Sequence, residues 1–232
     1  MAQPTPINRL ERRKARTRAA LIQAAQGFIA AGNPNVPIQE ITQAADVGLG
    51  SFYNHFQSKE ELYEAAVGQV LEVLGSLLDR VTAGIPDPAQ VFAQSFRLLG
   101  RWHRQNPDMS RVLLANGLAL AGSPQGLAPR ALRDIEAGVR SGRFTVRDPE
   151  LALTIIAGAS LCLGQFLHDH PERDDAEAVD QVAEDLLRVL GVTPKQAQRI
   201  AHLPLPDVDE VPQQDPAAAA GRPTRAAAAR AR

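Results

Sequence analysis

Aromatic residues and cysteine are scarce in this chain of 232 residues. Aromatic side chains make up 4% of the sequence and hydrophobic ones 44%, so the core must be built mainly from Ala, Leu, Val and Ile. Alternating β-branched runs, which are typical of strands, are also few, and such a composition favours packed helices. The lone Cys162 excludes an internal disulfide framework and fits a reducing compartment. We therefore predict an all-α protein in the cytoplasm.

Membrane, catalytic and metal signals are equally sparse. We find no apolar stretch of the ~18 residues that a membrane span needs, and no apolar segment follows the charges of the N-terminal MAQPTPINRLERRKARTR, as a secretory signal requires. No Ser/His/Asp or paired-carboxylate arrangement stands out. His168 and His170 lack a Cys or a distant His that would complete a metal site. We expect no membrane partner, no enzyme activity, no metal and no cofactor.

The net charge of −1 conceals a basic segment near the start of the chain. Between residues 9 and 18 only Glu11 opposes the basic side chains of Arg9, Arg12, Arg13, Lys14, Arg16 and Arg18. A local basic segment on a nearly neutral protein suggests contact with a polyanion. On composition alone, a solvated tail explains it equally well.

Apolar periodicity and turn residues predict a series of helices. The first begins at about Thr17 and ends at Gly32, a second short helix follows Pro37, and a third comes after a four-residue turn. The sequence S-K-E-E, from Ser58 to Glu61, is typical of a capping box and opens a long fourth helix that runs to about Thr82. Further helices are predicted at about 88–105, 107–121, 128–141, 149–168, 175–190 and 194–202.

These elements divide the chain into four parts. We expect residues 1–16 to form a disordered basic arm and residues 17–62 a three-helix domain. Residues 63–203 are predicted to form a larger helical domain. Residues 204–232 are rich in Pro and Ala, and we expect a disordered tail because they cannot bury enough apolar surface to offset the cost of ordering.

The third predicted helix has two different sides. It follows the turn Ala45-Asp46-Val47-Gly48, which is as tight as the turn of a helix-turn-helix. Helical periodicity places Phe52 and Phe56 together, toward the other helices, and Gly50 and Asn54 on the opposite side. Small residues at the start of this helix would let its backbone approach phosphates and base edges. The pattern therefore indicates a DNA-binding helix.

The segment of roughly residues 16–67 resembles the DNA-binding domain of the TetR (tetracycline-repressor) family of bacterial transcription regulators. The core of this resemblance is the pattern Phe52-Tyr53-x-His55-Phe56-x-x-Lys59, whose spacing is more specific than a bare helix-turn-helix. The rest of the chain agrees in length and helical content. The resemblance implies an N-terminal helix-turn-helix domain and a C-terminal helical domain for effector binding and dimerisation.

The resemblance also implies a set of DNA contacts. Side chains placed against the DNA backbone are those of Tyr53, His55 and Lys59, with Ser51 and Asn54 as further phosphate contacts. Residues within reach of base edges are Gln39, Leu49, Gly50 and Tyr53. Arg16 and Arg18 would add basic contacts. Packing remains an alternative for several of them, with Leu49 as a core edge, Tyr53 and His55 as packing groups and Asn54 as a solvated side chain.

Two positions depart from the family pattern. Pro37 stands where the family usually has Ser or Thr, which removes a phosphate-binding hydroxyl. Asp46 replaces the usual turn Gly; Asp tolerates the left-handed conformation, but it brings a negative charge near the phosphates. Operator affinity is then modest, unless basic residues between Arg12 and Arg18 compensate.

The helices predicted at 149–168 and 175–190 carry apolar stripes. The first stripe is Leu151, Ile155, Ala159, Leu163 and Phe166, and the second is Val179, Val182, Leu186, Leu187 and Leu190. From the residues alone this is a core pair. The resemblance makes it a homodimer interface, in which each subunit contributes two helices to a four-helix bundle. A two-fold dimer predicts a palindromic operator on double-stranded DNA.

The resemblance further implies an effector cavity between residues 88 and 141 and the C-terminal half of the fourth helix. Candidate lining residues are Phe92, Phe96, Trp102, Met109, Leu113 and Phe166, with His103 or Asn116 as polar handles; ordinary core packing is the alternative for each. A small, largely apolar and unidentified effector would favour one orientation of the fourth helix and move the two DNA-reading helices out of register.

The sequence therefore favours a ligand-responsive, dimeric DNA-binding repressor. The alternative is an effector-independent architectural or protein-interaction module that keeps the fold and whose DNA reading is weakened at Pro37 and Asp46.

Overall fold

The computed structural model describes residues 9–115 and 126–206, and every regular element in these ranges is a helix. The helices are α1 (Arg9–Ala30), α2 (Ile38–Ala44), α3 (Leu49–Tyr53), α4 (Lys59–Thr82), α5 (Pro88–Gln105), α6 (Pro107–Ala115), α8 (Leu127–Arg140), α9 (Pro149–Asp169), α10 (Asp175–Val189) and α11 (Pro194–Ala201). The all-α prediction is confirmed. The predictions for residues 1–8, 116–121 and 207–232 lie outside the described residues.

Local capping explains why several helices begin where the sequence predicts. The Ser58 hydroxyl accepts a hydrogen bond from the Glu61 amide at 3.2 Å and so caps α4. Asp87 and Asp148 accept backbone N–H groups at the starts of α5 and α9, each of which opens with a proline. Proline suits this position because the first helical N–H has no partner within the helix.

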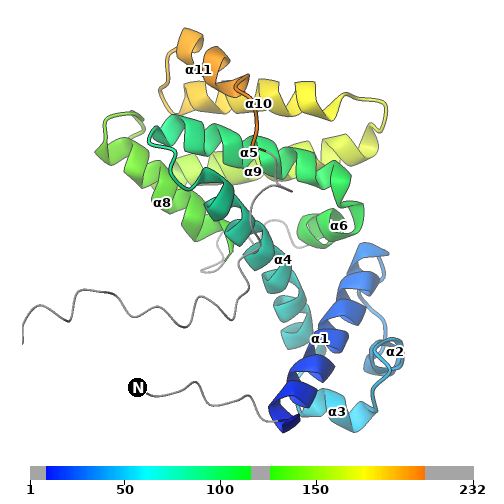
Figure 1. The fold of residues 1–232 in the computed structure, drawn as a ribbon. Coiled ribbons are helices and arrows are strands. Elements are labelled where there is room, and N and C mark those ends of the chain that lie inside the picture. The colour runs from blue at the N-terminus through cyan, green and yellow to red at the C-terminus, as the bar shows by residue number, and fades with distance from the viewer. Residues whose placement is uncertain (1–8, 116–125, 207–232) are drawn as a thin grey trace, which may run out of the picture.

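The first helix starts earlier than predicted. Residues Arg9–Arg16, which we expected in a disordered arm, form the first two turns of α1. Apolar periodicity is absent there, but Arg, Lys, Glu and Ala are all good helix formers, so propensity extends the helix beyond its buried stripe. The N-terminal end of α1 lies beside α3 (Figure 1). The basic residues therefore project from a helix rather than from a disordered arm.

Two hydrophobic cores are joined by α4. One contains residues of α1 to α4 together with Val112 and Leu113 of α6, and the other is formed by α5 and α8 to α11. Figure 1 shows α4 running from the small N-terminal lobe up into the larger one, where α5 lies at the centre and packs against α8, α9, α10 and α11. The predicted boundary at residue 62 thus falls inside a continuous helix.

By length and composition, α9 is apolar enough to cross a membrane, so the prediction that no segment has this character is wrong. Ile156, Leu163 and Leu167 on one side of α9 are buried in the C-terminal core. The opposite side is exposed, and only 28% of the most apolar window is buried. The helix α9 therefore combines a side that completes the C-terminal core with an exposed apolar side.

Candidate DNA-binding face and effector cavity

The turn before α3 has the conformation that the sequence predicts. Asp46 has a φ of 53°, in the left-handed region that Asp tolerates better than most residues. The amides of Asp46 and Val47 donate to the carbonyls of Gln43 and Thr42 at 3.1 and 2.9 Å. These hydrogen bonds end α2 and turn the chain sharply, which fixes the direction of α3.

Packing orients α3 through two aromatic side chains. Phe52 and Phe56 are 0% and 2% exposed in the N-terminal core, whereas Tyr53 is 60% exposed and Leu49 42%. Leu49 is therefore a surface residue and not a core edge. A Cβ added to Gly50 would meet no atom within 4 Å, so packing within the chain does not require glycine there. The outer side of α3 is open to an external partner.

Every residue predicted to contact DNA is accessible on this lobe. Gln39, Gly50, Tyr53, Asn54, Leu49, Arg16 and Arg18 are exposed, and Ser51, His55 and Lys59 are half-buried. We call this set, on α1, α2, α3 and the start of α4, the α3 face. Its members come from four consecutive elements, and the short turns between them hold it together.

Positive charge gathers where α1 meets α3. Burial together with the charges of Arg18 and Lys14 lowers the pKa of His55 below its usual value. The Arg18 guanidinium carbon lies 5.0 Å from the centre of the Phe56 ring, a cation–π contact that holds it beside the end of α3. The cations nearest to the end of α3 therefore come from α1, where Lys14 and Arg18 lie.

Lys59 is positioned at the junction of three elements. Its ammonium donates to the Val36 carbonyl at 3.4 Å and lies 5.9 Å from the Tyr63 ring centre. It sits in the first turn of α4, so the ammonium and the positive end of the helix dipole lie together. Both would favour a phosphate at this point.

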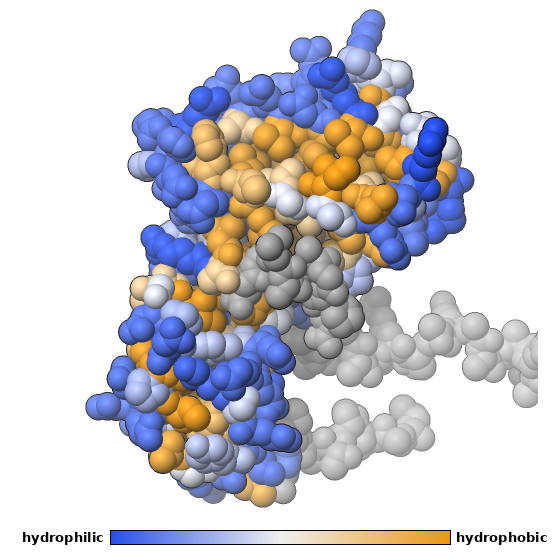
Figure 2. All heavy atoms as spheres, turned by 180° about the vertical axis from the view of Figure 1, so that it is seen from behind, coloured by the Kyte–Doolittle hydropathy of each residue, from blue (hydrophilic) through white to orange (hydrophobic). Residues whose placement is uncertain are grey.

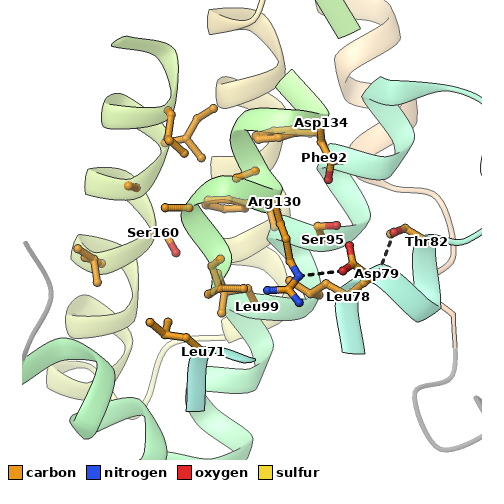
Figure 3. Close-up of a pocket in the computed structure, with 18 of the residues that line it drawn as sticks. Leu71, Leu78, Asp79, Thr82, Phe92, Ser95, Leu99, Arg130, Asp134 and Ser160 are labelled. Carbon is orange, nitrogen blue, oxygen red and sulfur yellow. Dashed lines mark hydrogen bonds and ion pairs between the residues drawn. The ribbon is translucent and has the colours of Figure 1, made fainter. Parts of the chain in front are cut away.

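A second feature is a cavity of about 150 Å³ between α4, α5, α8 and α9. Most of its lining is apolar, including Leu71, Phe96, Leu99 and Ile156. Figure 3 shows its polar end, where Arg130 of α8 reaches Asp79 of α4. A cavity of this size with a similar lining binds a ligand such as benzene.

The polar end is held by ion pairs. Arg130 donates to Asp79 at 2.8 Å and to Glu72 at 2.7 and 3.1 Å, and Arg133 donates to Asp79 at 2.9 Å. Burial acts to raise the pKa of Asp79, but hydrogen bonds from Arg130 and Arg133 and their charges outweigh it, and the pKa stays below its usual value. The hydrogen bond from Arg130 is the largest effect lowering the pKa of Glu72. These two carboxylates are ionised at neutral pH.

The structure places the predicted cavity residues in different surroundings. Three of them, Phe92, Phe96 and Leu113, line the cavity. Trp102 lines a separate hollow between α4 and α5, and Met109 packs against the N-terminal core. Phe166 is 40% exposed with its ring 4.4 Å from that of His170, so its assignment is wrong. Asn116 lies outside the described residues.

His103, predicted as a polar handle, instead belongs to a buried hydrogen-bond chain. The Ser110 hydroxyl of α6 lies 2.6 Å from His103 Nδ1 of α5 and 2.7 Å from His168 Nε2 of α9. Burial, helped by the nearby His168, lowers the pKa of His103 to about 4; burial and the charges of Arg111 and Arg104 lower that of His168. With both imidazoles neutral, the hydroxyl donates to one and accepts from the other.

The hydrogen bonds of Ser110 make α6 part of both lobes. Ser110 ties it to α5 and α9, while Val112 and Leu113 are buried in the N-terminal core, where α6 packs against α1. Leu113 also lines the cavity. A displacement at the cavity can therefore reach α1 through α6 as well as through α4.

The outer side of α9 is an exposed apolar surface. Leu151, Ile155 and Phe166 of the predicted stripe are 63%, 52% and 40% exposed, and Cys162 is exposed among them. Figure 2 shows a broad apolar area across the C-terminal lobe, on the side away from the viewer in Figure 1. The α10 stripe is different: Val179, Leu186, Leu187 and Leu190 are buried within the subunit, so α9 carries the exposed apolar surface.

The cavity lining that sequence reasoning missed comes from α4, α8 and α9, with Ser95 and Leu99 of α5. One signal was available in α8, where Arg130 and Asp134 lie four residues apart, on the same side as the apolar Leu127 and Ala131. Charged residues on an apolar helix side need partners, and Asp79 and Glu72 of α4 supply them for Arg130.

Two family descriptions match most of the chain. "Bacterial regulatory proteins, tetR family" matches residues 21–66, and "Tetracyclin repressor-like, C-terminal domain" matches residues 87–203. The first segment contains the helix-turn-helix and the start of α4, and the second contains α5 to α11.

Known proteins resemble the chain over most or part of its length. The crystal structure of RolR without ligand has a TM-score of 0.69 and 34% identity, over 82% of this chain and 98% of that one. RolR in complex with resorcinol gives a TM-score of 0.62 and 34% identity, over 85% and 98%. The transcriptional repressor DhaR of Mycobacterium sp. (strain GP1) is 44% identical over 66 residues, 28% of this chain and 31% of DhaR.

A further relative is the nucleoid occlusion factor SlmA of Shewanella sediminis (strain HAW-EB3), 29% identical over 164 residues, 64% of this chain and 82% of SlmA. Because the two family descriptions match the helix-turn-helix lobe and the C-terminal lobe in turn, the chain belongs to the TetR family of bacterial regulatory proteins.

Proposed function

We propose that this DNA-binding regulator is a cytoplasmic, homodimeric repressor that binds a palindromic operator and is released by a small effector. The observation that carries the proposal is the α3 face, where Tyr53 and Leu49 are exposed and Gly50 leaves the backbone open. The Arg18 and Lys59 side chains flank this surface from α1 and α4. Phosphates would be bound by the cations and bases read from α3.

Dimerisation through the outer side of α9 supports operator recognition. Exposed Leu151 and Ile155 on a long apolar helix are costly in water and are covered when two copies associate. A two-fold axis at this surface would let the two α3 helices of the dimer bind the two half-sites of one palindromic operator.

The interface is tested with Ile155→Asp, which should give a monomer by analytical ultracentrifugation and lose operator binding. Val73→Asp, at an exposed apolar residue of α4, is the matched control and should stay dimeric. In the native dimer Cys162 should react slowly with maleimide, and in the Ile155→Asp monomer quickly. A dimer that survives Ile155→Asp would exclude this surface.

The effector would occupy the cavity between α4, α5, α8 and α9. Its volume of about 150 Å³ suits one aromatic ring, and RolR, with 34% identity over nearly its whole length, binds resorcinol in its crystal structure. Occupation would press on Leu71 of α4 and Leu113 of α6, and both helices pack against α1. Binding that favours one arrangement of these helices shifts the spacing of the two α3 helices.

The first experiment is selection of bound duplexes from a random pool by the full chain at near-physiological salt. We expect a palindrome, and we expect its affinity to fall steeply as salt is raised. Ala157→Phe, which fills the cavity from α9, should keep operator binding and lose effector response. Enrichment of no sequence by a folded protein would contradict the proposal.

The similarity to the nucleoid occlusion factor SlmA favours one other candidate, an effector-independent architectural or protein-interaction module. The two candidates differ at the cavity. A regulator released by effector loses operator affinity when the cavity is occupied, whereas an effector-independent module binds the same duplex with or without ligand.

A further inference from the structure

The polar end of the cavity offers acceptor oxygens but few free donors. Arg130 is the cation that lines it, and four of its five N–H groups are already used: one on Asp79, two on Glu72 and one on the Gly126 carbonyl. With one N–H group left, this guanidinium cannot form a further pair of parallel hydrogen bonds with the carboxylate of a ligand. Arg130 is therefore a structural cation of the cavity wall.

Asp134 supplies a free acceptor at the same end. Its Oδ1 accepts from Arg133 Nε at 2.9 Å and lies 2.8 Å from the second Arg133 nitrogen. Its Oδ2 forms no hydrogen bond with the residues that the structure describes, and its side chain is 25% exposed at the cavity. The Asp79 oxygens each accept one hydrogen bond and retain capacity for another.

The charges of the cluster do not cancel. Glu72, Asp79 and Asp134 face two guanidinium groups, those of Arg130 and Arg133, which leaves one net negative charge beside an apolar cavity. An anionic ligand would lose its hydration and meet this charge. A neutral hydroxyl would instead donate a charge-assisted hydrogen bond to a carboxylate.

We infer that the cavity selects an uncharged single-ring aromatic that carries hydroxyl donors and rejects its carboxylated analogues, with Asp134 as a specificity-determining residue. This inference rests on the proposed role of the cavity as the effector site. The apolar walls, including Phe96 and Ile156, bind the ring. Asp134 and Asp79 accept its hydroxyls on one side, and the Ser160 hydroxyl of α9 lies on the other (Figure 3).

Three single-ring ligands, of which the two analogues of resorcinol have the same number of non-hydrogen atoms, test the inference by calorimetry on the full chain at neutral pH. Resorcinol has two donors, 3-hydroxybenzoate replaces one of them with an anion, and 1,3-dimethoxybenzene keeps the oxygens but has no donor. We expect both analogues to bind at least about tenfold more weakly than resorcinol, because each leaves a buried acceptor unpaired. Binding of 3-hydroxybenzoate as tight as that of resorcinol overturns the inference.

Asp134→Asn separates specificity from a structural role. Asparagine keeps the shape and removes the charge, so the preference for resorcinol over 3-hydroxybenzoate should fall by about tenfold or more. A residue with a purely structural role would weaken both ligands alike and leave their ratio unchanged, which overturns the assignment. Asp185→Asn, at an exposed carboxylate of α10 paired with Arg188, is the control and should change neither affinity.

Failure of the inference and failure of the proposed function give different results. If 3-hydroxybenzoate or 1,3-dimethoxybenzene binds in preference to resorcinol and releases the operator, the effector site stands and the donor selectivity is wrong. If none of the three ligands binds, or Ala157→Phe leaves binding unchanged, the inference falls together with the assignment of the effector to this cavity, whereas operator binding is decided separately by the duplex selection. Should Asp134→Asn fail to fold, the ligand series on the unaltered protein still decides.

Discussion

The two lobes use the same basic residue types in opposite ways. In the C-terminal lobe Arg97, Arg130 and Arg143 are each bound by carboxylates, at 2.7–2.8 Å. On the α3 face Arg18 and Lys59 form no ion pair within the described residues. The cations that hold the C-terminal lobe together are thus neutralised by carboxylates, whereas these two cations of the face proposed to bind DNA remain available for a polyanion.

The largest effect is expected on the free energy of unfolding when a buried arginine loses its carboxylate partner. Arg97 is 4% exposed and is bound by Asp180 and the Leu203 carbonyl. Asp180→Ala leaves this charge buried without a carboxylate, so unfolding free energy should fall by about 3–5 kcal/mol. Denaturant titration measures it. Asp185→Ala on the same helix, with an exposed partner, should cause no measurable loss; equal effects would contradict the distinction.

A buried neutral imidazole should make the C-terminal lobe sensitive to acid. His103 has a pKa lowered to about 4, so between about pH 4 and pH 6.5 the unfolded chain holds a proton that the native chain lacks. Stability is then full above about pH 6.5 and falls as the pH drops toward 4, by on the order of 3 kcal/mol. His103→Gln, which can still reach Ser110, should show a smaller decline in thermal unfolding over this range. An unchanged pH dependence would exclude His103 as its source.

An available cation should affect DNA binding and leave stability alone. Lys59→Gln is expected to weaken operator binding about tenfold and to lower the slope of log affinity against log salt by about one. Fluorescence anisotropy across a salt series measures both quantities. Lys195→Gln, at an exposed lysine of α11, should change neither. A loss of affinity without a change in salt slope would mean that Lys59 positions α2 through the Val36 carbonyl and does not contact phosphate.

The smallest effect is expected at the turn. Asp46→Asn keeps a residue that tolerates a φ of 53° and removes a negative charge near the phosphates. Operator affinity should rise by roughly two- to threefold at low salt, and the gain should fade as salt screens the charge. The same duplex and anisotropy assay suffice. A fall in affinity would show that the carboxylate helps to hold the turn.

Local signals in the sequence predicted the buried side of α3, the turn before it and the start of α4. The spacing of Phe52 and Phe56 determines which side of α3 is buried, and the Asp46 turn and the Ser58 cap act within a few residues of themselves. The start of α1 was missed because its first turns have helix propensity without a buried stripe. A helical segment without buried residues shows no apolar periodicity, so periodicity cannot reveal where it starts.

The cavity was harder to predict because its walls come from helices distant in the sequence. Phe92 and Phe96 were expected and line it, but Asp79 and Arg130 meet only once α4 and α8 are packed, 51 residues apart. Phe166 fails for the same reason: its position on a helix is evident from sequence, whereas the side that faces the core depends on α5 and α8. A single sequence does not reveal which side chains on different helices come into contact.

The placement of α6 bears on how such regulators can be recombined. Because Val112 and Leu113 complete the N-terminal core, a fragment cut after α4 would expose the apolar surface that they cover, and a chimera joined at that point would pair this core with a foreign α6. A chimera that exchanges the C-terminal lobe should therefore keep the α6 of the N-terminal lobe, so that the packing of α6 against α1 is preserved.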